Sequence, residues 1–361
     1  MKNPEIARLI LEDGKEYPGK PFGAVKPVAG EVVFNTAMTG YPESLTDPSF
    51  KGQILVSTYP LIGNYGVPEF LMQDELPAFF ESDRVQVSGL VVQDYSFDFS
   101  HWNAGKSLDQ WLKEFQVPGI TGIDTRALTR HIREFGVMSG KIVYESSDEV
   151  EFYDPNQENL VARVSCDEVK TYGSGTHNVA VIDCGVKANI IRCLLKRDTT
   201  VIRVPWDYDI SGLEVDGVLI SNGPGDPTMA KRTIETVRSL LEGNKPVFGI
   251  CLGSQLMALS AEAKTYKLKY GHRGHNQPVQ QVGTRHCYIT AQNHGYAIDT
   301  ATLNDEWEIF FENVNDQTCE GIRHKYKPFF AVQFHPEASG GPVETEFLFD
   351  DFIKHIQYQK G

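Results

Sequence analysis

The chain has 361 residues, of which 41% are hydrophobic and 23% charged, which is close to the globular average and predicts two domains. Its 48 Asp and Glu outnumber 34 Lys and Arg and give a formal net charge of -14, which disfavours nucleic acid and anionic membrane surfaces as partners. The longest apolar runs, such as residues 217–220, fall far short of the roughly 20 residues that span a membrane. The N-terminus lacks the continuous apolar segment of a secretory signal. We therefore expect a cytoplasmic protein that binds small molecules or other proteins.

The first half of the sequence predicts a β-rich domain. Short β-branched and aromatic runs, which are typical of strands, occur at residues 31–36, 54–58 and 85–92. Helices are expected at residues 107–114 and 125–134. Asp124 is a good N-cap for the second helix, and Gly136 follows its end. We assign residues 1–145 to an N-terminal β-rich α/β domain.

A change in composition separates the two halves. Residues 145–158 contain six acidic residues and no Lys or Arg, and residues 171–178 read TYGSGTHN. An acidic stretch followed by a Gly/Ser-rich one is typical of a domain boundary. We therefore predict a linker over residues 146–177.

The second half alternates between apolar strands and amphipathic helices. Strands are expected at residues 179–183, 200–204, 215–221 and 247–250, and helices at residues 189–196, 228–242 and 255–263. Such alternation predicts a doubly wound, mostly parallel sheet in a domain of residues 178–361. Because ligands bind at the carboxyl ends of such strands, we expect chemistry after residues 183, 221 and 250.

The last of these turns places Cys251 between a strand and a helix. Gly249 and Gly253 flank it, as in a nucleophile elbow, where glycines allow a sharp turn that exposes the side chain. The positive end of the helix favours a thiolate, and the amide of Leu252 points to where an oxyanion would form. Cys251 is therefore a candidate nucleophile, with a buried structural cysteine as the alternative.

A cysteine nucleophile needs a base, and the base needs an orienting group. His335 follows the apolar run of residues 329–334, and Glu337 shares its face of an extended segment. We therefore interpret His335 as the candidate base and Glu337 as its orienting carboxylate. The alternative is a structural histidine at the end of a strand.

The turn SNGPGDP at residues 221–227 carries two glycines and two prolines. Gly223 or Gly225 could bring a backbone amide close to a substrate as a second oxyanion donor. The same residues are equally consistent with a rigid turn into the next helix.

Motifs in both halves resemble one family. SNGPGDP, GICLGSQ at residues 249–255, QNHGY at 292–296 and HPEAS at 335–339 resemble the class I (triad) glutamine amidotransferase domain, which has a flavodoxin-like fold. Residues 31–54, 58–66 and 123–134 look like the N-terminal domain of the small, glutamine-hydrolysing chain of carbamoyl-phosphate synthetases. The resemblance covers nearly the whole chain and implies a glutaminase subunit of that enzyme.

The resemblance implies a role for each matching position. Cys251 would attack the side-chain amide of glutamine, His335 would act as base and then acid, and Glu337 would orient His335. Gly223 and Leu252 would offer the oxyanion amides. The positions that match glutamine-binding residues are Ser49, Gly223, Gly225, Leu252, Gln255, Asn293, Gly295 and Tyr296. Because Ser49 belongs to the first domain, the resemblance suggests a substrate close to the domain boundary.

Three places depart from the family pattern. Ser254 stands where histidine is usual, Tyr296 stands where phenylalanine is common, and residues 271–278 keep the family's Gly, His, Asn and Pro but vary between them. Four histidines suggest a metal site, but their spacing fits no common ligand pattern: His272, His275, His286 and His294. We expect neither a metal nor another cofactor in this chain.

The family implies a large partner subunit that uses ATP and Mg to make carbamoyl phosphate from bicarbonate and the ammonia released here, for arginine and pyrimidine synthesis. The sequence has no G-x-x-x-x-G-K-[ST] phosphate loop, so ATP chemistry is expected in that partner, in a heterodimer or a higher assembly. Two alternatives are a glutaminase subunit of another synthetase and a non-catalytic regulatory partner.

Overall fold

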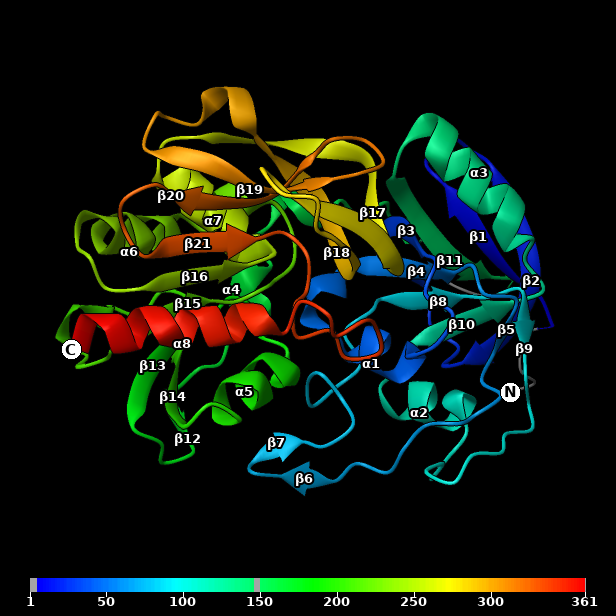
Figure 1. Ribbon diagram of the computed structural model, residues 1–361. Coiled ribbons are helices and arrows are strands. Elements are labelled where there is room, and N and C mark those ends of the chain that lie inside the picture. The colour runs from blue at the N-terminus through cyan, green and yellow to red at the C-terminus, as the bar shows by residue number, and fades with distance from the viewer. Residues whose placement is uncertain (1–4, 146–149, 361) are drawn as a thin grey trace. The chain divides into compact units, whose positions relative to one another are not determined.

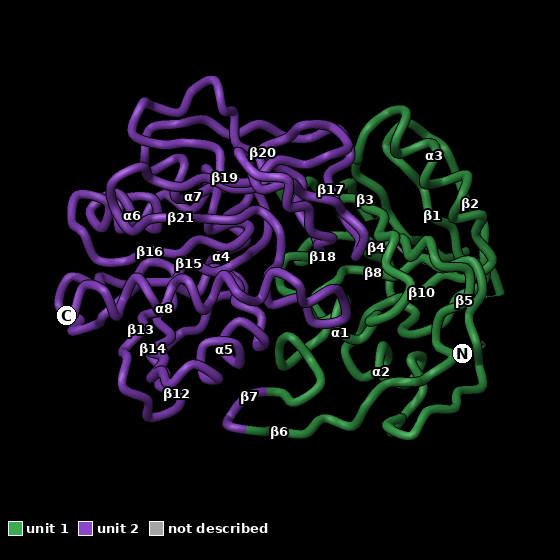
Figure 2. The backbone as a smooth tube through the Cα atoms, viewed as in Figure 1, with its two compact units in different colours: residues 1–73, 77–157 green, residues 74–76, 158–361 purple. Residues whose placement is uncertain are grey.

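The computed structural model describes residues 5–145 and 150–360 and divides the chain into two compact units (Figure 2). Unit 1 comprises residues 1–73 and 77–157, and unit 2 comprises residues 74–76 and 158–361. Of the segment predicted as a linker, residues 146–149 lie outside the described residues. Residues 158–177 belong to unit 2 and include a strand of its sheet, because short polar segments can pair at a sheet edge.

Seven strands in the described part of unit 1 form a closed barrel in the order β1-β11-β3-β4-β8-β10-β2 (Figure 1). They are β1 (Ala7–Leu11), β2 (Glu16–Gly23), β3 (Val28–Asn35), β4 (Gln53–Ser57), β8 (Gly89–Val91), β10 (Pro118–Thr121) and β11 (Met138–Tyr144). β3, β4, β8 and β10 pair in parallel, and the other neighbours are antiparallel. Closure leaves these strands without an unpaired edge.

The remaining elements of unit 1 are short. Helices are α1 (Tyr41–Thr46), η1 (Pro48–Phe50), α2 (Leu108–Glu114), α3 (Thr125–Phe135) and η2 (Pro155–Gln157), and small strands are β5 (Leu61–Ile62), β6 (Met72–Gln73) and β9 (Asp94–Tyr95). A further small strand, β7 (Leu76–Pro77), has its first residue in unit 2 and its second in unit 1. The structure confirms both predicted helices. Ser107 forms a capping box with Gln110 at the start of α2, and the Asp124 carboxylate accepts the Ala127 amide at 2.8 Å.

Unit 2 is built on a ten-stranded mixed sheet, counted over its described residues, in the order β12-β14-β13-β15-β16-β21-β20-β19-β17-β18. Its strands are β12 (Lys170–Tyr172), β13 (His177–Asp183), β14 (Thr199–Pro205), β15 (Gly217–Ile220), β16 (Val247–Ile250), β17 (Lys264–Gln281), β18 (Cys287–Asp299), β19 (Trp307–Asn313), β20 (Cys319–His324) and β21 (Phe329–Val332). The five strands from β14 to β21 in this order are parallel, which confirms the predicted architecture.

Helices cover both faces of this sheet (Figure 1). They are α4 (Val161–Val164), α5 (Ala188–Leu195), η3 (Ile210–Gly212), η4 (Pro227–Met229), α6 (Lys231–Glu242), α7 (Leu252–Ser260), η5 (Thr300–Thr302) and α8 (Phe347–Lys360). α5 and α8 pack in one buried apolar cluster, and α6 and α7 pack in the other. Over residues 5–145 and 150–360, no helix is long and apolar enough to cross a membrane.

Phe248 is the central aromatic residue of the face covered by α5 and α8. It is fully buried, stacks on Phe330 with ring centroids 4.5 Å apart, and contacts Phe349 and Phe352 of α8. The residue lies three positions before Cys251, so the packing that holds α8 to the sheet also fixes the strand that leads to the elbow.

We predict that Phe248→Ala lowers the free energy of unfolding of unit 2 by about 3–5 kcal/mol, because it leaves a large cavity in this cluster. Denaturant unfolding followed by circular dichroism measures the change. Tyr326→Ala is the matched control, since the Tyr326 side chain is 82% exposed and its loss should cost at most about 0.5 kcal/mol. Equal costs for the two variants would contradict the prediction.

Candidate active site

Cys251 lies in a strained turn between β16 and α7. Its backbone has φ 53° and ψ -105°, a conformation that residues with a side chain rarely adopt. The flanking glycines are required by packing, since a Cβ on Gly253 would lie 2.2 Å from the Ile220 carbonyl oxygen and one on Gly249 would lie 2.7 Å from that of Gly253. The predicted elbow is therefore present, with Cys251 as the residue before the first turn of α7.

His335 and Glu337 follow the end of β21. The His335 Nδ1 atom lies 2.7 Å from Glu337 Oε1, and both side chains are almost fully buried. The His335 amide donates to the Ala291 carbonyl of β18 at 2.9 Å, which fixes the backbone beside the ring. The other ring nitrogen, Nε2, is buried and makes no hydrogen bond of usual length among the described residues, so it is available for proton transfer.

The charges around His335 favour its imidazolium form. Burial by itself lowers the pKa of His335, but the Glu337 carboxylate and the nearby Cys251 sulfur oppose burial and raise the pKa well above 6.5. Burial raises the pKa of Glu337, whereas Lys187 and His335 lower it by more, so the group stays ionised. The arrangement stabilises a carboxylate and an imidazolium next to the sulfur, and an imidazolium stabilises a thiolate.

Lys187 is a site residue that the sequence interpretation missed. Its Nζ atom lies 2.8 Å from Glu337 Oε1, and its side chain is 7% exposed. Asn189 Nδ2 also donates to the Glu337 carbonyl oxygen. Lys187 comes shortly after β13, at one of the strand ends where chemistry was expected, but no spacing rule relates it to a carboxylate 150 residues later.

The candidate oxyanion donors lie next to each other. Gly223 follows β15, and a Cβ placed on it would lie 2.8 Å from a side-chain atom of Leu252 and 2.1 Å from the Cys184 carbonyl oxygen. The Leu252 amide opens α7, where the first N–H groups have no partner within the helix. Gly225 has φ +84°, which glycine adopts readily. The turn after β15 and the start of α7 therefore approach closely, as two oxyanion donors require.

The predicted glutamine-binding residues of unit 2 meet around Cys251. Gln255 Nε2 donates to the Tyr296 carbonyl oxygen at 3.1 Å, and Cys251 Sγ lies 3.7 Å from the Asn293 carbonyl oxygen. Gly295 lies between Asn293 and Tyr296 on β18. Ser49 lies in unit 1, within η1, where its amide donates to the Asp47 carboxylate at 2.9 Å. Its part in binding glutamine stays a prediction.

Gln333 is a second residue that the sequence interpretation missed. It directly follows β21, is fully buried, and has its Nε2 atom 3.7 Å from Cys251 Sγ. Glutamine is common on protein surfaces, so only its position two residues before His335 hinted at a role. The structure thus adds a neutral amide to the groups around the sulfur.

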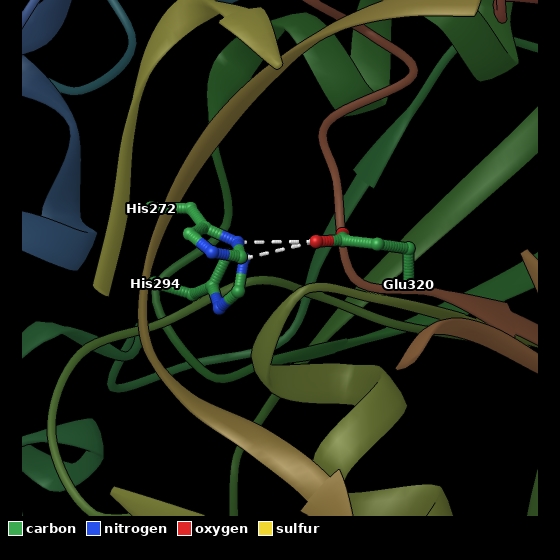
Figure 3. Close-up of side chains that lie close together, drawn as sticks. All are labelled: His272, His294 and Glu320. Carbon is green, nitrogen blue, oxygen red and sulfur yellow. Dashed lines mark hydrogen bonds and ion pairs between the residues drawn. The ribbon is translucent and has the colours of Figure 1, made fainter. Parts of the chain in front are cut away.

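His294 of the QNHGY segment forms a buried pair with His272 (Figure 3). His272, His294 and Glu320 offer ligand atoms within 4.8 Å of one another, and in the described residues they are the group that could hold a metal ion. His272 Nδ1 and His294 Nε2 lie 3.1 and 3.8 Å from Glu320 Oε1, and tetrahedral zinc sites place such atoms roughly 3.4 Å apart. His275 and His286, considered with them from the sequence, do not belong to this group.

Hydrogen bonds account for the arrangement of His272. Its Nδ1 lies 3.1 Å from Glu320 and its Nε2 lies 2.8 Å from Asp316, so an imidazolium can donate to both carboxylates. Although burial lowers the pKa of His272, these two carboxylates raise it overall. His294 Nδ1 lies 2.8 Å from the Tyr296 carbonyl oxygen, which links this cluster to the segment that bears Asn293.

The other cysteines have different surroundings from Cys251. Cys184, Cys193 and Cys319 are buried, and burial is the main cause that raises the pKa of Cys193 and Cys319 to about 12. Cys287 is exposed. None of these four cysteines has the positive φ found at Cys251.

Comparisons with known proteins agree with this geometry. Residues 180–355 match the family described as glutamine amidotransferase class-I, and residues 9–142 match the carbamoyl-phosphate synthase small chain, CPSase domain. The chain is 49% identical over 364 residues to the carbamoyl phosphate synthase arginine-specific small chain of Saccharomyces cerevisiae, which covers 97% of this chain and 89% of that protein.

Longer relatives contain the same region. The mitochondrial carbamoyl-phosphate synthase (ammonia) of Homo sapiens is 51% identical over 362 residues, covering 99% of this chain and 24% of that protein. The multifunctional protein CAD of Squalus acanthias is 50% identical over 356 residues, covering 97% of this chain and 16% of that protein. The chain thus spans about a quarter or less of these two relatives. Two matching family regions in order, and the near full-length match to the yeast small chain, show that this chain belongs to the carbamoyl-phosphate synthase small chain family.

Proposed function

We propose that this chain hydrolyses glutamine and supplies ammonia for the synthesis of carbamoyl phosphate. The observation that carries the proposal is Cys251 at a strained strand-to-helix elbow. It interacts with a buried His335 that is paired with Glu337 at 2.7 Å. A structural cysteine needs neither the strained backbone nor a charged histidine, and both features have a cost in stability.

The chemistry follows from these groups. Cys251 and His335 share one proton, and the reactive form is the ion pair in which this proton is on His335 Nε2. The Cys251 thiolate of this pair attacks the side-chain carbonyl carbon of glutamine. The amides of Gly223 and Leu252 stabilise the oxyanion of the tetrahedral intermediate. His335 then protonates the amide nitrogen as its bond to carbon breaks, which releases ammonia and leaves a thioester on Cys251 and a neutral imidazole. Attack by a water that His335 deprotonates releases glutamate and restores the thiol.

Specificity for glutamine is proposed to come from residues around the sulfur. We assign glutamine binding to Gly225, Gln255, Asn293, Gly295 and Tyr296 of unit 2. The resemblance to the family gives Ser49 the same role, which stays a prediction. The tyrosine hydroxyl at position 296 and the serine at position 254 are the family departures that distinguish this chain. The reaction is proposed to use no metal or organic cofactor in this chain, since every step uses a thiol, an imidazole or a backbone amide.

The ammonia is proposed to reach a large partner subunit, which uses ATP and Mg to convert it with bicarbonate into carbamoyl phosphate for arginine and pyrimidine synthesis. The longer relatives support such a partnership, because in them a region like this chain is part of a much larger protein. A glutaminase of another synthetase is not favoured, because the first half also matches the small-chain family.

The first test is Cys251→Ala in the complex with the large subunit. We expect this variant to lose glutamine-dependent carbamoyl phosphate synthesis by at least about 10³-fold, because no other group replaces the nucleophile. Synthesis from added ammonia should stay within about twofold of the wild type. Glutamate release and carbamoyl phosphate formation measure the two activities. A variant that loses both, or keeps both, would contradict the proposed role of Cys251.

A second test uses the charge on Glu337. Because the pKa of His335 is raised, the imidazolium is fully present below pH 6.5 and is lost only as pH rises through the raised value. This loss should lower wild-type activity at alkaline pH. Glu337→Gln removes the negative charge that raises the pKa of His335 against the effect of burial. The pKa of His335 should therefore fall, and the alkaline limb of the pH–rate profile should move to lower pH. We expect kcat to fall roughly 10²- to 10⁴-fold. Glutaminase rates from pH 6 to pH 10 measure both effects, and an unmoved alkaline limb would show that Glu337 does not set the charge of His335.

A third test concerns metals. Removal of divalent ions from the purified chain with EDTA should leave glutamate release within about 20% of the untreated rate, because the proposed steps use only protein groups. Metal analysis of the same sample accompanies the assay. Loss of glutaminase activity that returns on addition of zinc would instead assign a functional ion to His272, His294 and Glu320.

A further inference from the structure

The amide of Gln333 occupies a position that the proposed mechanism does not yet use. Its Nε2 atom lies 3.7 Å from Cys251 Sγ, within reach of a hydrogen bond to sulfur. Its Oε1 atom accepts a hydrogen bond from Gln255 Nε2 at 3.0 Å. The backbone N–H of Gln333 donates to the backbone carbonyl oxygen of Glu320 on β20 at 2.8 Å, which fixes the main chain that carries the side chain.

The hydrogen bonds determine which end of the Gln333 amide faces the sulfur. The Tyr296 carbonyl oxygen can only accept, so the Gln255 amide must present Nε2 to it. The same Nε2 faces Gln333, which must therefore present its oxygen. The reversed orientation of Gln333 would place two NH₂ groups against each other. The remaining end, an N–H donor, is thereby directed to Cys251.

Ser254 supports the same orientation. Its hydroxyl donates to the Cys251 carbonyl oxygen at 2.8 Å and lies 3.4 Å from Gln333 Oε1. The residue is fully buried, so it fills the space beside the amide. The side chain that departs from the family pattern therefore packs against Gln333 and confines it to the side of the sulfur.

A donor at this position distinguishes the two forms of the cysteine. A thiol can donate to the Asn293 carbonyl oxygen at 3.7 Å, whereas a thiolate has no proton to give and is repelled by that oxygen. A thiolate accepts a hydrogen bond from Gln333 more strongly than a thiol does, because bonds to charged acceptors are stronger. The His335 imidazolium and the Gln333 N–H thus offset the repulsion between the thiolate and the Asn293 carbonyl oxygen.

We propose that Gln333 is a further catalytic residue of the glutaminase reaction, which donates a hydrogen bond to Cys251 Sγ and stabilises the thiolate that attacks the substrate. The proton lost by the sulfur goes to His335 Nε2, and no other bond is formed or broken in this step. Gln255 holds the donor in place, which makes Gln255 a positioning residue for the sulfur. The proposal rests on the proposed function for its catalytic part, but the thiolate itself can be measured without glutamine.

The experiment measures the rate at which iodoacetamide alkylates Cys251 between pH 5 and pH 10, in the absence of glutamine. Mass spectrometry of peptides assigns the modified cysteine, and the exposed Cys287 of the same molecule is the internal reference. Gln333→Met removes the donor with little change in size. Gln333→Asn keeps a neutral amide but shortens the side chain by one methylene, which withdraws the donor from the sulfur, so it tests the donor even where the Met variant folds poorly.

A matched control is Gln280→Met. Gln280 is an exposed glutamine of β17 whose amide donates to the Thr284 carbonyl oxygen at 2.9 Å. Gln280 lies in the same unit but outside the site. In this variant, both Cys251 and Cys287 should therefore be alkylated at the wild-type rate.

In both Gln333 variants we expect iodoacetamide to alkylate Cys251 about tenfold more slowly near pH 7 than in the wild type, while the alkylation rate of Cys287 stays unchanged. Glutaminase kcat should fall by a similar factor, while KM stays within about twofold. An unchanged alkylation rate of Cys251 would overturn the proposal even if kcat fell, because Gln333 would then only pack against Gln255. Slower alkylation together with no glutamate release from the wild-type complex would overturn the proposed function and leave the thiolate assignment standing.

Discussion

The buried carboxylate of Glu337 is the charge on which the site depends. It lies 2.7 Å from His335 and 2.8 Å from Lys187, and all three side chains are almost removed from water. A buried charge without a partner costs several kcal/mol, so each cation needs this carboxylate and the carboxylate needs both cations. The fold must therefore bring the ends of β13 and β21 together before the site can exist.

The backbone pairing of the parallel sheet brings these strand ends together and does not depend on the contacts between the catalytic side chains. β13, β15, β16 and β21 are neighbours, and each ends at the same edge. Lys187, Gly223, Cys251 and His335 follow these four ends. Backbone pairing and the buried aromatic cluster around Phe248 thus place residues that are far apart in sequence to within a few ångströms. The antiparallel hairpin of β17 and β18 adds the segment with Asn293 and Tyr296 beside them.

Sequence patterns predicted the parts of this arrangement that depend on local rules. The elbow, the caps of α3, and the strands from β13 to β16 follow from glycine spacing, capping residues and apolar runs. Lys187 and Gln333 were not predicted, because a buried ion pair or amide is defined by partners on other strands. The β17–β18 hairpin was also missed, since it is rich in Lys, Gln and His and lacks the apolar alternation of a strand. The barrel of unit 1 closes through non-local pairing, which no short motif specifies.

Because Cys251 has a positive φ, the residue that would best stabilise the fold at this position differs from the residue that the reaction needs. A residue with a side chain in this conformation costs roughly 1–3 kcal/mol, and glycine alone adopts it without strain. A chain that carried glycine at position 251 would therefore be the more stable protein and would have no nucleophile. Selection for the reaction must therefore keep the cysteine at a cost in stability. A lineage that no longer used glutamine would gain stability by replacing Cys251 with glycine.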